Sequence, residues 1–401
     1  MTELSTSLIH HPYEAPTGFA APQHAVHKAS TVFFPNVEAM RRRQWKDKSA
    51  YTYGLHGTPT TYALEERLCT LEGGAQCVLV PSGLAAVALV ALAVLQSGDE
   101  VLIPDNAYGP NKTLAEGELR SWGISHRYYN AMDPQDLAEK LSPATRLVWV
   151  EAAGSVTLEF PDLPALVRIC RQHGALVALD NTWGAGIAFK PFDLLPGAKE
   201  DLGVDISAHA LTKYPSGGGD VLMGSVITRD LALHLKIKLC HMRLGLSVGA
   251  NDAEMVLRSL PSIALRYRAH DEATRALATW CQTQAAFAQV LHPALKDSPG
   301  HEHWQSLCDR PDGGAACLFS VVFAPHFSQA QVDAFCDALQ LFKLGYSWAG
   351  PISLVVPYEL QTMRSVWPPE IAKGTVVRFS VGLEAVADLQ ADIAQALKAM
   401  A

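Results

Sequence analysis

The stretch ALVALDNTWGAG, residues 175–186, is a short apolar run that ends in a carboxylate, Asp180, and then in a turn with two glycines. A run of this length without polar alternation predicts a strand that is buried on both faces. Similar runs alternate with helical patterns between residues 76 and 255: CVLV, EVLIP, RLVWVE, VDISAHA and VLMGSVIT. Such an alternation predicts a large α/β domain with a parallel or mixed sheet covered on both sides.

The regions on either side of this domain differ from it. Residues 1–55 are rich in His, Pro and aromatic residues and show little periodicity, so we expect an extended arm. Residues 256–401 contain a long helical pattern, IALRYRAHDEATRALATWCQTQAAFAQVL, then two strand patterns, CLFSVVFA and TVVRFSVG, and two further helices, QAQVDAFCDALQ and DLQADIAQALKAM. We therefore expect an arm over 1–55, the α/β domain over 56–255 and a smaller α+β domain over 256–401.

Composition favours a small-molecule partner. The chain has 401 residues, 49% of them hydrophobic, and a formal net charge of −8 with its Lys and Arg scattered along the sequence. This distribution argues against a nucleic-acid or anionic membrane surface as the main partner. The eight cysteines show no CxxC or Cys/His ligand spacing, so we expect no metal site and no disulfide framework.

The sequence shows neither a signal peptide nor a membrane span. The first sixteen residues lack the charged and apolar regions of a signal peptide, so we expect a cytoplasmic protein. The apolar run LAAVALVALAVL is only a dozen residues long, which predicts a core helix and not a membrane span.

Lys213, in LTKYPSGGGD (211–220), follows the apolar run VDISAHA. A lysine charge taken out of water costs several kcal/mol unless it is neutralised or bonded. Asp180 also ends an apolar strand, where it is either a helix cap or a buried acceptor for a cationic partner. Because open α/β sheets bind ligands at the carboxyl ends of their strands, we expect the two side chains to face one pocket.

A third feature, PSGLAAV (81–87), joins a strand to a helix. Its Ser-Gly pair either caps the helix or directs free backbone amides at a phosphate group. No GxxxxGK[ST] loop is present, which disfavours a nucleoside triphosphate. A phosphate cradle, a buried carboxylate and a semi-buried lysine together match the needs of pyridoxal 5′-phosphate, whose aldehyde bonds to a lysine and whose pyridine nitrogen pairs with an acid.

The whole chain resembles the Cys/Met-metabolism family of pyridoxal-phosphate enzymes. The motifs that carry the resemblance follow in the family's order: YGLHGTPTTYALEERLCTLEGG, PSGLAAV, NAYGP, GSVTLEF, DNTWGAG, ALTKY, HPAL, GHEHW, GYSWAG and TVVRFSVGLE. The resemblance implies the aspartate aminotransferase fold (fold type I), pyridoxal phosphate as cofactor, an amino-acid thioether as substrate, and a homotetramer built as a dimer of dimers.

The resemblance also implies roles for individual residues. Lys213 bonds to the cofactor aldehyde, Asp180 pairs with the pyridine nitrogen, and Tyr108 stacks on the ring. The phosphate is held by Ser82, Gly83, Leu84 and Thr212. Tyr53 crosses from the arm to the site of a neighbouring subunit, where it binds cofactor and assists catalysis. The substrate is bound by Arg378, which clamps the α-carboxylate, with Ser347, Trp348 and Asn181.

The family contains β-lyases, γ-lyases and γ-synthases, so the fold alone does not choose the reaction. Trp183 and Trp348 stand where γ-enzymes usually have Phe and Leu, which favours a carbon–sulfur β-lyase acting on cystathionine or a related cysteine S-conjugate. The alternatives are a γ-synthase or γ-lyase on the same scaffold, and a binding protein without catalysis. Two positions depart from the family: Leu55 replaces an arginine that pairs with the phosphate, and Ala210 replaces a serine.

Overall fold

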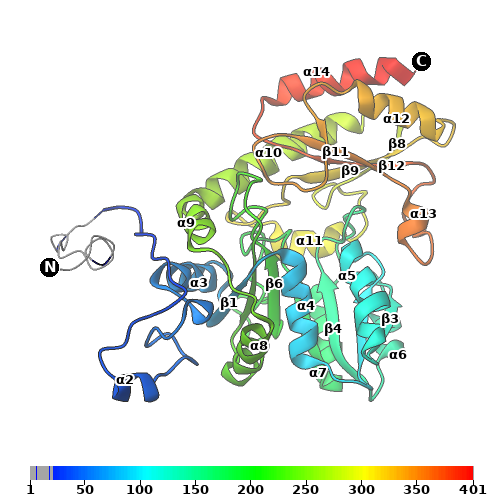
Figure 1. Cartoon of the computed structure of the whole chain (residues 1–401). Helices are drawn as coiled ribbons and strands as arrows, with labels where there is room; N and C mark the ends of the chain where they lie inside the picture. The colour runs from blue at the N-terminus through cyan, green and yellow to red at the C-terminus, as the bar shows by residue number, and fades with distance from the viewer. Residues whose placement is uncertain (1–5, 7–17, 19–20, 401) are drawn as a thin grey trace.

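A computed structural model of the chain describes residues 6, 18 and 21–400 (Figure 1). Most of the first sixteen residues, over which the sequence shows no signal-peptide pattern, lie outside this range. Two sheets organise the described chain, one of seven strands and one of five.

The seven-stranded sheet has the order β1-β7-β6-β5-β4-β2-β3. Its strands are β1 (Gln76–Val80), β2 (Glu100–Pro104), β3 (Ser125–Tyr129), β4 (Thr145–Glu151), β5 (Leu176–Asp180), β6 (Ile206–Ala210) and β7 (Gly224–Thr228). Neighbouring strands are parallel except that β7 runs antiparallel to β1 and β6. The mostly parallel sheet predicted from the sequence is confirmed.

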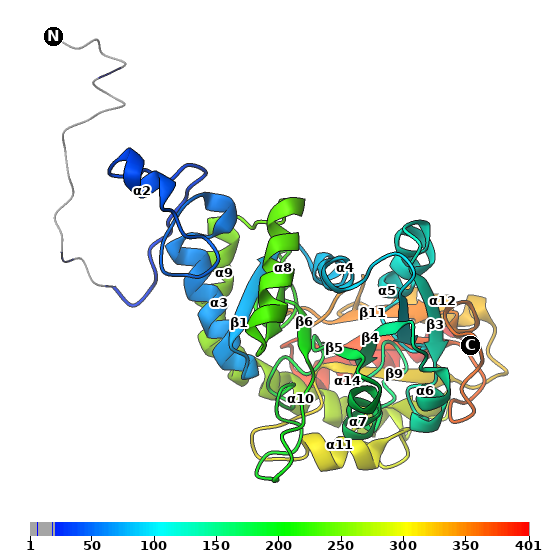
Figure 2. The same cartoon turned by 90° about the horizontal axis from the view of Figure 1, so that it is seen from below.

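Helices cover both faces of this sheet, as Figure 2 shows. One face carries α4 (Gly83–Val94), α5 (Gly109–Leu114) with η2 (Ala115–Leu119), and α8 (Leu231–Leu244). The other carries α3 (Pro59–Glu72), α6 (Pro134–Lys140), α7 (Leu163–His173) and α9 (Ala250–Ser259). Two apolar cores therefore sandwich the strands, which explains their unbroken apolar sequences.

The five-stranded sheet has the order β10-β11-β12-β9-β8. Its strands are β8 (Phe287–Leu291), β9 (Leu318–Phe323), β10 (Lys343–Leu344), β11 (Leu354–Tyr358) and β12 (Val376–Ser380), and all pairs are antiparallel except β10 with β11. Its apolar core is closed by α10 (Ile263–Cys281), α12 (Gln329–Ala338) and α14 (Val386–Ala396).

The remaining elements are short. The arm contains α2 (Val37–Arg41) and η1 (Gly54–His56), and the rest of the chain contains η3 (Leu260–Ser262), α11 (His301–Cys308), α13 (Leu360–Met363) and η4 (Leu397–Met400). Among the described helices none combines the length and the apolarity needed to cross a bilayer. No group of three or more His, Cys, Asp or Glu in the described residues could hold a metal ion.

Two sequence predictions were wrong in detail. The long helical pattern after residue 263 ends at Cys281, and FAQVL at its end forms strand β8 instead. The smaller domain accordingly has five strands, whereas the sequence analysis found only two strand patterns there. The apolar residues of FAQVL continue the spacing of α10, so periodicity alone does not reveal the break.

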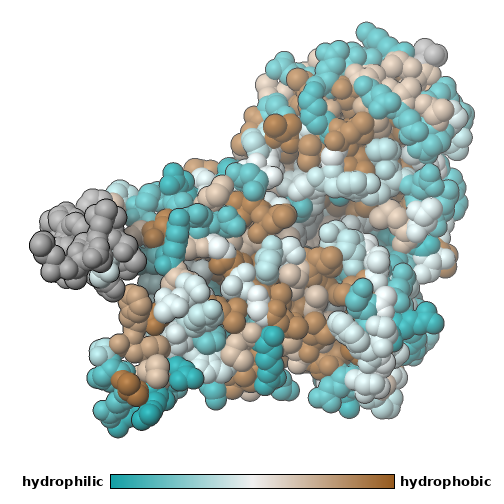
Figure 3. All heavy atoms as spheres, viewed as in Figure 1, coloured by the Kyte–Doolittle hydropathy of each residue, from teal (hydrophilic) through white to brown (hydrophobic). Residues whose placement is uncertain are grey.

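The apolar run at 84–95 forms most of α4, which confirms a helix within the folded domain. Its buried residues, such as Leu89 and Val90, face the sheet, while Leu84 is exposed. Figure 3 shows apolar residues (brown) gathered over this part of the surface.

The predicted boundary after residue 255 falls inside α9. Since α9 packs against α3 of the large domain, we propose that the large domain extends to the end of α9.

The packing of α4 on the sheet leads to a stability prediction. Leu89 is fully buried, whereas Leu265 on α10 is 70% exposed. Leu89→Ala is expected to lower the free energy of unfolding by about 2–5 kcal/mol, because it removes buried methyl groups and leaves a cavity. Leu265→Ala is the matched control, with an expected change within about 0.5 kcal/mol. Denaturant midpoints of the two variants measure the difference; equal midpoints would contradict this packing.

Candidate active site

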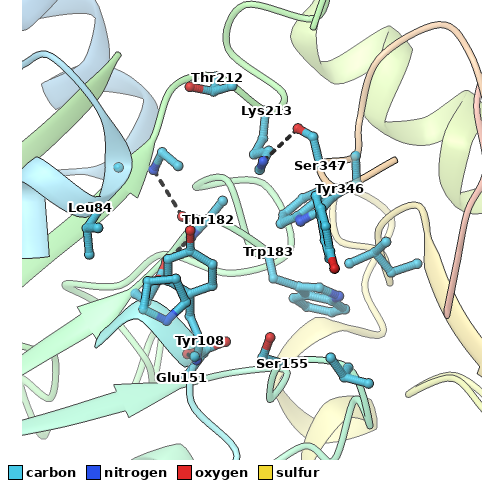
Figure 4. A pocket seen from close by; sticks show the side chains of 18 of the residues that line it. Leu84, Tyr108, Glu151, Ser155, Thr182, Trp183, Thr212, Lys213, Tyr346 and Ser347 are labelled. Carbon is cyan, nitrogen blue, oxygen red and sulfur yellow. Dashed lines mark hydrogen bonds between the residues drawn. The ribbon is translucent and has the colours of Figure 1, made fainter. Parts of the chain in front are cut away.

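A cavity of about 550 Å³ opens where strands β4, β5 and β6 end. The large domain supplies its floor, and the second domain supplies residues Tyr346–Trp348, Tyr358 and Arg378 of its wall. Figure 4 shows side chains from both parts converging on this space. Its position at the carboxyl ends of parallel strands is the one expected for an open α/β sheet.

Lys213 lies just beyond the end of β6 and points into the cavity (Figure 4). Its Nζ donates a hydrogen bond to Ser347 Oγ at 2.7 Å and lies 5.6 Å from the ring centroid of Trp348. Burial, with the positive charge of Arg378, lowers the pKa of Lys213 to about 8. A substantial fraction of this amine is therefore neutral near physiological pH, which a nucleophile or a base requires.

Asp180 is the last residue of β5 and lies on the cavity floor. Its Oδ1 accepts a hydrogen bond from the backbone amide of Thr182 at 3.0 Å. Burial raises the pKa of this carboxyl group, and the Thr182 hydrogen bonds and the neighbouring basic side chains only partly oppose that rise. The side chain can accept a hydrogen bond from, and pair with, a cationic group bound in the cavity.

Helix α4 begins at the cavity. Ser82 is its N-cap and accepts a hydrogen bond from the amide of Ala85 at 3.0 Å, while Ser82, Gly83 and Leu84 all line the cavity. A Cβ on Gly83 would lie 2.5 Å from Cβ of Ala210, so only glycine lets the helix start approach β6 this closely. The positive end of the helix dipole and the amides of its first turn are thus directed at the cavity, as an anion requires.

Thr212 and Tyr108 also line the cavity. The hydroxyl of Thr212 donates to the carbonyl of Met223 at 3.4 Å and accepts from the amide of the same residue at 3.3 Å. Tyr108 is the N-cap residue of α5, and 42% of its surface is exposed in the single chain. Its ring is therefore open to contact with a planar ligand.

Arg378 projects from the middle of β12 and is buried to 8% exposure. Its only described hydrogen bond is a long one of 3.4 Å from Nη2 to the carbonyl of Ser347, its Nε has no partner, and no carboxylate among the described residues pairs with it. Its guanidinium lies 5.4 Å from the ring centroid of Tyr358. Such an arginine is prepared to bind a carboxylate bidentately.

The loop of Ser347 and Trp348 forms the wall beside these cations. Ser347 has a positive φ of 98°, a backbone conformation that non-glycine residues rarely adopt. In this conformation its hydroxyl accepts from Lys213 while its carbonyl faces Arg378. Trp183 also lines the cavity and packs edge-on against Phe160, with 5.7 Å between the ring centroids.

Two predicted residues do not line this cavity. Asn181 is fully buried, and its side-chain amide donates to Glu72 Oε2 at 3.0 Å, because a residue that follows Asp180 points to the other face of the strand. The role of Asn181 in substrate binding stays a prediction. Tyr53 lies in the arm, where Ser30 donates a hydrogen bond to its hydroxyl at 3.3 Å. Its place in a neighbouring subunit stays a prediction.

Sequence reasoning also missed lining residues. The most important is Glu151, the last residue of β4, whose Oε2 accepts a hydrogen bond from the backbone amide of Tyr108 at 2.7 Å. Like Asp180 it is a carboxylate at the end of an apolar strand, so the same signal could have found it. Ser155 and His209 line the cavity as well.

Comparison with known proteins shows the family to which the chain belongs. Residues 5–398 match the model of the family described as Cys/Met metabolism PLP-dependent enzyme. The chain belongs to this family.

Relatives match the chain over almost its full length. A cystathionine β-lyase of Bordetella avium is 37% identical, over 96% of this chain and 94% of its own. The cystathionine β-lyase MetC of Escherichia coli is 33% identical, over 98% and 97%. Among solved structures, a cystathionine γ-synthase of Xanthomonas oryzae pv. oryzae in complex with aminoacrylate and cysteine is 30% identical, with a TM-score of 0.83 over 96% of this chain and 95% of that one.

Pyridoxal phosphate is the cofactor of the family and hence of this enzyme. The donor set fits it: α4 offers amides for a phosphate, Asp180 offers an acceptor for a protonated ring nitrogen, and Lys213 offers an amine for the aldehyde. Arg378 stays free for a substrate carboxylate.

The lowered pKa of Lys213 is open to measurement in the cofactor-free protein. Competitive labelling with an amine reagent, followed by mass spectrometry of the Lys213 peptide, should give a midpoint near pH 8 in place of the usual 10.5. Arg378→Met should raise this midpoint because it removes a positive charge near the amine, whereas Arg243→Met, on the exposed end of α8, should not. A midpoint at 10.5 in the unsubstituted protein would show that the amine is fully hydrated.

Proposed function

We propose that this enzyme is a carbon–sulfur β-lyase that cleaves cystathionine, or a related cysteine S-conjugate, to a thiol, pyruvate and ammonia. With cystathionine the thiol is homocysteine. The observation that carries the proposal is the buried amine of Lys213, hydrogen-bonded to Ser347 beside the unpaired guanidinium of Arg378. An amine base next to an arginine that can bind a carboxylate suits the deprotonation of an amino acid at Cα.

The reaction needs a substrate held by its carboxylate. Arg378 binds that group with two parallel hydrogen bonds, and the Ser347 loop fixes the distance between the clamp and Lys213. Bound pyridoxal phosphate supplies an electron sink for the pair left at Cα when its proton departs. Lys213 takes this proton on its neutral Nζ.

The Cβ–S bond then breaks, and the sulfur keeps the bonding pair and takes up a proton. Two groups lining the cavity can donate it, the protonated Lys213 and the hydroxyl of Tyr108. The remaining three-carbon fragment takes up one water molecule and leaves as pyruvate and ammonia. One water is consumed for each substrate cleaved, so the atoms balance.

Two tryptophans support β-cleavage over chemistry at Cγ. Trp183 and Trp348 both line the cavity, and the Trp348 ring lies close to Lys213 Nζ. Bulky indoles restrict where the amine can reach, which disfavours deprotonation at Cβ, the step that γ-cleavage or γ-replacement requires. The second candidate function remains γ-synthase or γ-lyase activity, favoured by the similarity to a solved cystathionine γ-synthase.

The products formed from cystathionine separate the two functions. We expect pyruvate and homocysteine, and no 2-oxobutanoate, in a keto-acid assay. Lys213→Ala should lower kcat by at least about 10³-fold because it removes the acid–base group. Lys236→Ala, an exposed lysine of α8, should retain full activity. 2-Oxobutanoate as the main keto acid would reject β-cleavage in favour of the γ-reaction.

We further propose a cytoplasmic homotetramer in methionine biosynthesis, in which Tyr53 completes the site of a neighbouring subunit. The eight cysteines are free thiols, which suits a reducing compartment. In the single chain the arm exposes large apolar side chains, Phe33 by 94% and Tyr53 by 45%, and α4 exposes Leu84. Apolar surfaces of this kind suit contact with another subunit.

Mixed oligomers test the sharing of Tyr53. Tyr53→Ala and Lys213→Ala should each be nearly inactive as homo-oligomers. Co-expressed, they should regain part of the activity, because some sites combine an intact Lys213 with an intact Tyr53 from the neighbour. A mixture of Asp180→Ala with Lys213→Ala is the control: both residues line the cavity of one chain, so every site lacks one of them and no activity should return. Failure of the first mixture to regain activity would contradict the sharing.

A further inference from the structure

Glu151 is a carboxylate of the cavity that the proposed reaction does not use. It ends β4 at the same level as Asp180 ends β5, because the two residues are paired in the parallel register of these strands. Both line the cavity. No Lys, Arg or His among the described residues forms an ion pair with Glu151.

The contacts of the two carboxyl groups differ. Glu151 accepts one described hydrogen bond, from the backbone amide of Tyr108 at 2.7 Å. Asp180 accepts from the amide of Thr182 and lies near two basic side chains, His209 and Lys213. Two adjacent buried carboxyl groups do not readily both ionise, and the one with more favourable partners keeps the charge.

The other groups near Glu151 reinforce this difference. Tyr108 covers it on the α5 side, and the two lie together in Figure 4. Tyr129 of β3 is buried, and its hydroxyl donates to the carbonyl of Trp149 and not to Glu151. Burial and the charge of Asp180 raise the pKa of Glu151 well above its usual range, and only the Tyr108 hydrogen bond lowers it.

We propose that Glu151 is a positioning residue: its neutral carboxyl group holds the backbone of Tyr108 at the cavity and leaves the negative charge of the pair on Asp180. The contact fixes Tyr108 at the start of α5, where no side chain caps the helix. The single charge then sits on the carboxylate that pairs with the ring nitrogen of the cofactor. This role rests on the cofactor of the family and not on which carbon–sulfur bond is cleaved.

The protonation state is testable without cofactor or substrate. The infrared difference spectrum between the cofactor-free protein and its Glu151→Gln variant at pH 7 should show the carbonyl band of a protonated carboxyl group. Glu139→Gln, at an exposed glutamate of α6, is the matched control and should show carboxylate bands only. Carboxylate bands for Glu151→Gln would overturn the proposal.

Cofactor binding tests the positioning. Glutamine keeps a neutral oxygen that can accept from Tyr108, whereas alanine does not. Glu151→Ala should therefore bind pyridoxal phosphate about 10-fold more weakly than Glu151→Gln, the effect of one lost hydrogen bond. Equal dissociation constants for the two variants would show that the contact does not position Tyr108. Neither readout involves turnover, so a failure of the β-lyase proposal would leave both results unaffected.

Discussion

The arrangement depends on the burial of one amine. Lys213 lies just beyond β6, where burial removes most of the water around its amine. Its Nζ forms a single hydrogen bond, to Ser347, and the nearby positive charge of Arg378 disfavours the protonated form. An amine in this position is more easily neutral than one in solvent. The rest of the site follows from that constraint: a carboxylate within reach of the same space, a helix start that attracts an anion, and a clamp from the second domain.

The fold brings these groups together from distant parts of the chain. Parallel strands place Glu151, Asp180 and the residues after β6 at the carboxyl ends of neighbouring strands. The close contact of Gly83 with Ala210 places the start of α4 beside them. Arg378 comes from the middle of an antiparallel strand in the other sheet. The cavity therefore requires both domains, and a change in their packing would alter the distance between Lys213 and Arg378.

Much of this was predictable from sequence, because a charge at the end of an apolar strand is conspicuous. That signal found Asp180 and Lys213, and it would have found Glu151 had the end of RLVWVE been treated alike. Strand pairing, which sequence does not display, is what shows that Glu151 and Asp180 are neighbours. Sequence also does not show where the side chain of Asn181 points: it follows β5, donates to Glu72 and does not line the cavity. Strand β8 was hidden because its apolar residues continue the helical spacing of α10.

The central claim is that Lys213 carries the cofactor. Reduction of the purified holoenzyme with borohydride, then digestion and mass spectrometry, would locate the covalent link. The account predicts one peptide with the added mass of reduced pyridoxal phosphate, and that peptide contains Lys213. The adduct on another lysine, with Lys213 unmodified, would contradict the account.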